Sequence, residues 1–123
     1  MKTQVSKYTK NSLHYLRNAS KFIDAGDTEK ASEFLWGSIA QALKALAASK
    51  GFRLRSHQQL NAYALGVSKE LKDISIYDAF LHANLLHKNF YEAELEQKEV
   101  VVRAEMIKPA VGKLLELISS LEG

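Results

Sequence analysis

The chain has 123 residues, the size of one domain, and its 46% hydrophobic and 25% charged residues are the balance of an ordinary globular protein. It contains no cysteine, which excludes disulfide bonds, thiolate metal sites and a cysteine nucleophile. The net charge is +3, and residues 1–60 hold ten Lys or Arg against four Asp or Glu, which permits contact with a polyanion.

Apolar residues recur at the helical period along nearly the whole chain. The first helix is expected from about Thr3 to Ala25, and Gly26 just past its end is a typical C-terminal stop. The second is expected from about Thr28 to Lys50, after a cap at Asp27. It is apolar on two sides, so we place it at the centre of a bundle, with Trp36 in the core.

Three more helices follow. The run from Ser56 to Gln59 is a capping box that opens the third helix, which we expect to bury Leu71 among its apolar residues. A second box starting at Ser75 is expected to open the fourth helix. The fifth, from about Gln97 to Leu121, carries a coiled-coil-like apolar seam. The predicted members of this seam are Val100, Ala104, Ile107, Val111, Leu114, Ile118 and Leu121.

These helices predict an all-α fold, an antiparallel up-and-down bundle of four to five helices that forms a single domain over residues 1–123. The first residues lack the hydrophobic run of a secretory signal. No segment reaches the ~18 consecutive apolar residues of a membrane span. We therefore expect a cytoplasmic protein without a membrane partner.

The stretch from Leu81 to Glu92 is unusually rich in polar and aromatic residues. His82 and His87 are five residues apart, so on a helix they point about 140° away from each other. Helical metal pairs need a spacing of three or four, so we expect neither a metal nor a cofactor. His87 is either a satisfied core histidine or a cleft residue that transfers protons near neutral pH. The polar neighbours that either cap the helix end or line such a cleft are Asn84, Lys88, Asn89 and Tyr91.

The start of the third helix is a second candidate site. A helix N-terminus presents free backbone amides to an anion, and Arg53 and Arg55 stand beside His57 there. The simpler interpretation of His57 is an exposed residue without a role. A basic row on the first helix likewise is either a solvated face or a ridge that contacts phosphates. Its members are Lys7, Lys10, His14, Arg17 and Lys21.

Three stretches together resemble the archaeal PaREP family, which belongs to the HEPN superfamily of helical bundles. They are the Trp-Gly at residues 36–37, the Ser-His at residues 56–57 and the segment from Leu86 to Glu92. The resemblance covers about residues 28–121. It implies a HEPN-like bundle that pairs as a homodimer.

The resemblance also bears on activity. In active HEPN ribonucleases an Arg lies five residues before a His, and two such pairs meet across the dimer to cut RNA without metal. His87 matches that His, but the position five earlier is His82 and not Arg, and Ala83 follows it. Other HEPN proteins are binding or partner subunits, notably companions of minimal nucleotidyltransferases.

The leading expectation is therefore a non-enzymatic module that homodimerises and binds a nucleotide, RNA or a partner protein. One alternative is a metal-independent endoribonuclease with His87 as general acid/base and His82 as phosphate contact. Another is a structural adaptor whose partner docks on the amphipathic last helix.

Overall fold

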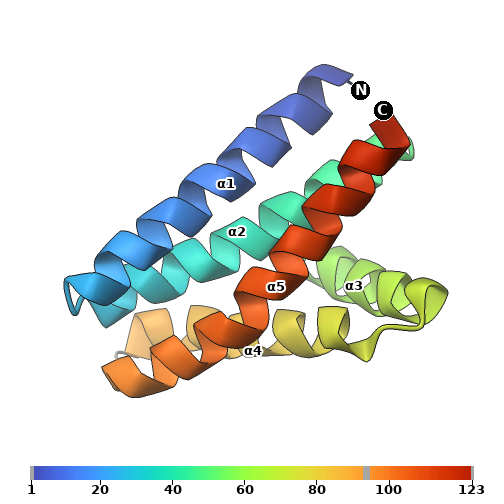
Figure 1. Ribbon diagram of the computed structural model, residues 1–123. Helices are drawn as coiled ribbons and strands as arrows, with labels where there is room; N and C mark the ends of the chain where they lie inside the picture. Colours follow the sequence, from blue (N-terminus) through green and yellow to red (C-terminus); the bar gives the residue numbers. More distant parts are fainter. Residues whose placement is uncertain (1, 93–94, 123) are drawn as a thin grey trace.

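The computed structural model describes residues 2–92 and 95–122, apart from the side chains of residues 89–92. The described residues form five helices and no strand (Figure 1). These helices are α1 (Lys2–Asp24), α2 (Thr28–Ser49), α3 (His57–Leu71), α4 (Ile74–Glu92) and α5 (Gln97–Glu122). The predicted all-α bundle is confirmed, and every expected helix is present, with each predicted end matched or shifted by at most two residues. No helix in the described ranges is long and apolar enough to cross a membrane.

Helix α2 is the centre of the bundle, as its two apolar sides predict. It contacts all four other helices, and twelve of its residues are buried. Helix α1 packs mainly on α2 as an antiparallel hairpin, while α4 and α5 cover other sides of α2 (Figure 1). Helix α3 contacts α4 and, less extensively, α2, and within the described part of the chain it contacts neither α1 nor α5.

Turn and cap residues that are recognisable in the sequence form the α1–α2 hairpin. Gly26 has a φ of +76°, a conformation that costs glycine little, and the side chain of Asp27 accepts a hydrogen bond of 3.1 Å from the backbone N–H of Lys30. Gly37 then lets the two helices approach closely. A Cβ placed there would lie 2.9 Å from Cδ2 of Tyr15, so the Tyr15 ring occupies the space that any other residue needs.

The caps of α3 and α4 differ in how well the sequence predicts them. The first capping box is confirmed in its main contact, because the Ser56 hydroxyl accepts a hydrogen bond of 3.1 Å from the N–H of Gln59. The side chain of Gln59 also reaches back, but its Oε1 accepts from the N–H of Arg55 at 2.6 Å instead of that of Ser56. The box expected at Ser75 is wrong. The acceptor is Asp73, whose Oδ1 binds the N–H of Ser75 at 3.0 Å, and α4 already begins at Ile74.

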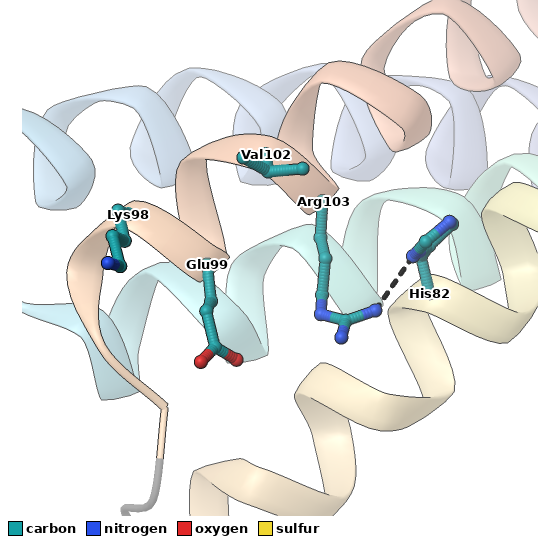
Figure 2. A pocket seen from close by; sticks show the side chains of 5 residues that line it. All are labelled: His82, Lys98, Glu99, Val102 and Arg103. Atoms are coloured by element: carbon teal, nitrogen blue, oxygen red, sulfur yellow. Dashed lines mark hydrogen bonds between the residues drawn. The ribbon is translucent and has the colours of Figure 1, made fainter.

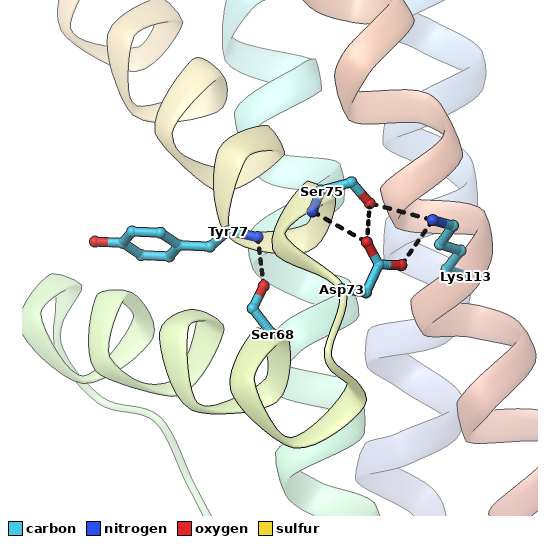
Figure 3. A network of polar contacts seen from close by, with 5 residues as sticks. All are labelled: Ser68, Asp73, Ser75, Tyr77 and Lys113. Carbon is cyan, nitrogen blue, oxygen red and sulfur yellow. Dashed lines mark hydrogen bonds and ion pairs between the residues drawn. The ribbon is translucent and has the colours of Figure 1, made fainter.

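The turn between α3 and α4 is tied to α5 by a polar network (Figure 3). Nζ of Lys113 donates to Oδ2 of Asp73 at 2.7 Å and to the hydroxyl of Ser75 at 3.1 Å. Hydrogen bonds from Lys113 and then from Ser75 lower the pKa of Asp73 from 3.8 to about 2. The Ser68 hydroxyl accepts a hydrogen bond from the N–H of Tyr77 at 2.7 Å, which joins the end of α3 to the start of α4.

The predicted seam of α5 is buried in six of its seven positions, and only its last member is wrong. Leu121 is 52% exposed. It lies in the last turn of α5, where this helix and the first turns of α1 border an open hollow of about 580 Å³. Leu71 is also exposed, because it is the last residue of α3 and precedes the turn at Lys72, whose φ is 55°.

Candidate functional site

Four aromatic rings from three helices meet beside the core, and we call them the ring cluster: Trp36 of α2, His57 of α3, and Phe80 and His87 of α4. The indole of Trp36 is stacked with both imidazoles, with centroid distances of 5.1 Å to His57 and 4.8 Å to His87. The two imidazoles are nearly parallel and 6.4 Å apart. The structure thus joins two histidines that the sequence placed in separate candidate sites.

A carboxylate completes this arrangement. Oε2 of Glu33 lies 3.0 Å from Nδ1 of His87, and the two side chains remain 37% and 29% exposed. A carboxylate on one imidazole nitrogen fixes the orientation of the ring. The sequence analysis missed Glu33. Its spacing of three from Trp36 was the available signal, since residues three apart share a helix face.

The sequence explains locally why these side chains meet. Phe80 and Ala83 are fully buried on the face of α4 that turns toward α2, and His87 follows one turn later at the edge of that face. The Ser56 cap fixes where α3 starts and therefore where His57 lies. Trp36 packs against the core as predicted but stays only partly buried, which makes it a support for both imidazoles.

The other predicted residues are distributed less compactly. Arg53 lines a separate hollow of about 400 Å³, which His57 does not line, so the expected corner is not assembled as one site. Arg55 is exposed near His57, and Lys88 is exposed next to His87 in the chain. Oδ1 of Asn84 is buried without a hydrogen-bond partner in the described ranges. The side chains of Asn89 and Tyr91 lie outside what the structure describes.

His82 lies on the other side of α4, as its spacing from His87 predicts, and its partner is a guanidinium. Nη1 of Arg103, from α5, lies 2.8 Å from Nδ1 of His82 (Figure 2). Because Arg can only donate, Nδ1 accepts and the imidazole is neutral with its proton on Nε2. Burial first, and then the charge of Arg103, lower the pKa of His82, while Asp78 acts in the opposite direction.

This second histidine borders a hollow of about 350 Å³ between α4 and α5. The residues that line it are His82, Lys98, Glu99, Val102 and Arg103 (Figure 2). The sequence analysis missed Arg103, because it lies on another helix, 21 residues after His82. No signal from spacing connects the two residues.

The basic row of α1 is exposed along its length, which agrees with a solvated face. Lys7 and Lys10 also line an open hollow of about 590 Å³ near the start of α1. Within the described ranges, no three His, Asp or Glu side chains gather closely enough to hold a metal ion.

Comparison with known proteins adds a family and a fold. The model of the archaeal PaREP1/PaREP8 family matches residues 7–111. A crystal structure of a protein from Sulfolobus solfataricus is similar to this chain, with a TM-score of 0.73 and 22% sequence identity, over 92% of this chain and 97% of that one. At this identity the likeness shows a shared fold. No curated protein sequence matches the chain significantly.

Proposed function

The chain belongs to the archaeal PaREP1/PaREP8 family, and from that premise we propose that it is a HEPN-like, non-enzymatic module that binds a nucleotide or single-stranded RNA at the ring cluster. The observation that carries this proposal is an exposed imidazole, His57, stacked on a partly buried indole, Trp36. A histidine that only fills a core is sealed and satisfied inside. Here the polar groups of the cluster stay within reach of solvent.

The cluster offers the groups that recognise a base. Aromatic faces stack on nucleobases, and such stacking contributes about 1–3 kcal/mol per base. The exposed carboxylate of Glu33 accepts hydrogen bonds from exocyclic amino groups or ribose hydroxyls. Two exposed cations next to the cluster in the chain, Arg55 and Lys88, supply charge for phosphates.

Trp36 makes this proposal directly testable, because it is the only tryptophan in the chain. Titration with mononucleotides and with short single-stranded RNA is expected to quench its fluorescence, and the affinity for RNA is expected to fall as salt rises. His57→Ala is expected to weaken binding about 5- to 100-fold, the effect of losing one stacking partner. Gln58→Ala, at the exposed neighbouring position, is the matched control. An unchanged fluorescence signal at millimolar nucleotide and micromolar RNA contradicts the proposal.

A second candidate function is metal-independent RNA cleavage, and one observation favours it. The carboxylate of Glu33 on His87, with His57 only 6.4 Å away, resembles a general base and a general acid placed around one reacting phosphate. In this geometry His57, rather than His82, is the partner of His87. Cleavage of single-stranded RNA in the presence of a chelator, lost in His87→Ala and in His57→Ala, supports this function. Intact RNA after long incubation at high protein concentration removes it.

Pairing of two chains is the third part of the proposal. The apolar sides of α2 are covered within the chain, so the apolar surface that remains for a partner includes Met106 of α5, which is 43% exposed. The same face is available to an adaptor partner, such as a nucleotidyltransferase-type protein. We expect a dimer by light scattering at micromolar concentration and a monomer for Met106→Glu. A monomeric wild type contradicts pairing, and the apolar face of α5 would then be a candidate surface for a different protein.

A further inference from the structure

Arg103 has no ion-pair partner in the part of the chain that the structure describes. No carboxylate there lies within ion-pair distance of it, and its hydrogen-bond partner is the neutral imidazole of His82. Its Nε is buried and has no hydrogen-bond partner there. A guanidinium carries five N–H donors, and one imidazole nitrogen satisfies only one of them.

A partly buried guanidinium in this state is unfavourable, since it has lost water and forms no ion pair in return. Other cations in the same protein are paired differently. Lys113, for example, binds the carboxylate of Asp73 at 2.7 Å although it is more exposed. His82 thus holds the guanidinium of Arg103 in place, while other N–H donors of this guanidinium have no acceptor among the described residues. These donors are suited to binding an anion.

The surroundings of Arg103 define the size and chemistry of that anion. The hollow of about 350 Å³ adds a second cation, Lys98, and an adjoining hollow of about 210 Å³ shares His82 and Arg103 with it. Glu99 lines the larger hollow and Asp78 the smaller one, so the site disfavours a ligand with many negative charges. Val102 is an exposed apolar residue of the lining and offers contact to the organic part of a ligand.

We propose that this hollow between α4 and α5 binds the phosphate group of a small phosphate monoester, with Arg103 as the bidentate donor and His82 as the residue that positions it. Arg is suited to this task because its planar fork matches two phosphate oxygens. The site lies on the opposite side of α4 from the ring cluster, so it does not depend on the function proposed there. The protein would then have two separate ligand sites, one on each side of α4.

Binding at this position is coupled to protonation. Nδ1 of His82 accepts the hydrogen bond from Arg103 only while the ring is neutral, so a proton on Nδ1 removes the contact that positions the guanidinium. The charged groups that face His82 are Arg103, which lowers its pKa, and Asp78, which raises it. Lys98 and Glu99 line the same hollow and largely offset each other. We therefore expect phosphate binding to weaken as the pH falls and His82 becomes protonated.

Calorimetric titration with inorganic phosphate and with glycerol 3-phosphate, a phosphate monoester that has no base to stack on the ring cluster, tests the proposal. Binding of the monoester that weakens as the pH falls is expected for the wild type. Arg103→Gln is expected to weaken it about 10- to 100-fold, the loss of charged hydrogen bonds. Arg17→Gln, an exposed arginine of α1, is the matched control and is expected to bind normally. If inorganic phosphate binds as tightly as the monoester, the free ion is the ligand. If inorganic phosphate binds more weakly, the ligand is the ester.

Two further measurements keep the test decisive. If Arg103→Gln is poorly folded, Arg103→Lys retains the charge but loses the fork, and it is expected to bind more weakly while His82 resonances still respond to phosphate. Binding at Arg103 leaves the fluorescence of Trp36 unchanged, so failure of the ring cluster and failure of this site are distinguished. Absence of heat with either ligand, or equal losses in Arg103→Gln and Arg17→Gln, overturns the proposal.

Discussion

Helix α4 carries two histidines, five residues apart, in opposite surroundings. His87 lies against the carboxylate of Glu33 and the indole of Trp36, at the junction with α2 and α3. His82 lies against the guanidinium of Arg103, at the junction with α5. One imidazole is therefore next to a negative charge and the other next to a positive charge, although both belong to the same two turns of helix.

This contrast teaches that the role of a histidine is decided by its partner and not by its own position in a helix. A carboxylate on Nδ1 fixes the orientation of the ring. A guanidinium on Nδ1 keeps the ring neutral and turns it into an acceptor that holds the arginine in place. The side of α4 that faces α2 is thus suited to base recognition, and the side that faces α5 is suited to anion binding.

The largest expected effect on stability comes from removing Trp36, the ring that supports the histidines on the side of α4 that faces α2. Trp36→Ala deletes the ring on which His57 and His87 stack, and we expect it to lower the free energy of unfolding by about 3 kcal/mol, at the lower end for a large aromatic because the ring is only partly buried. Urea denaturation measures this change. NMR resonances of His87 are expected to shift while those of His82 stay in place. A large shift at both histidines would show that the two sides are not independent.

A second, somewhat smaller effect is expected in α2, the helix that supplies Trp36 to the ring cluster. Gly37→Ala places a Cβ 2.9 Å from Cδ2 of Tyr15, and the aromatic ring must move to admit it. Overpacking of this kind costs about 1–3 kcal/mol, measured by urea denaturation. Gly66→Ala is the control, because the structure has open space around that position. Equal stability of both variants would mean that the Tyr15 ring adapts freely.

The third prediction tests the other side of α4. Burial and the charge of Arg103 hold the pKa of His82 below 6.5, so the unfolded chain takes up this proton first and stability falls as the pH drops below about 6.5. Arg103→Gln removes one cause and is expected to raise this pKa and to reduce the loss of stability in acid. NMR titration of the ring measures the pKa. Glu33→Gln is expected to leave His82 unaffected, and an equal response to both variants contradicts the assignment of partners.

The smallest effect is expected where α4 begins. The pKa of Asp73 is about 2 in the folded chain against an ordinary 3.8, so its contribution to stability is present above about pH 4 and is lost as the pH falls through about 2. Asp73→Asn is expected to flatten the acid limb of the stability curve, followed by circular dichroism. Asp24→Asn, at the exposed end of α1, is the control. An unchanged acid limb in Asp73→Asn would show that the contacts with Lys113 and Ser75 do not contribute.

The fold was predictable because each helix is encoded by its own neighbours in the chain. The glycine stop at Gly26, the Ser56 cap and the apolar seam of α5 are local signals, and the structure confirms them apart from Leu121 at the end of the seam. The errors are local as well. Ser75 was assigned as a cap because its side chain is of the right type, whereas Asp73 two residues earlier is the stronger acceptor and takes that role.

The candidate site was predictable only in part. Helical spacing correctly separated His82 from His87, and it identified α4 as the helix that carries both. The partners of these residues come from other helices. Glu33 precedes His87 by 54 residues and Arg103 follows His82 by 21. Contacts of this kind depend on how the helices cross, which no periodicity in a single sequence specifies.

The attachment of α3 has a consequence for motion. Because α3 rests on α4 and on a small part of α2, its hydrogen bonds are expected to exchange with deuterium through local opening, well before the α1–α2 hairpin exposes its own. His57 is the first residue of α3, so such an opening also lifts one of the two imidazoles away from the indole. The ring cluster that we assign to base recognition therefore depends in part on α3, the helix with the fewest contacts to the others. The position of His57 can adjust to a bound ligand at a small cost in free energy.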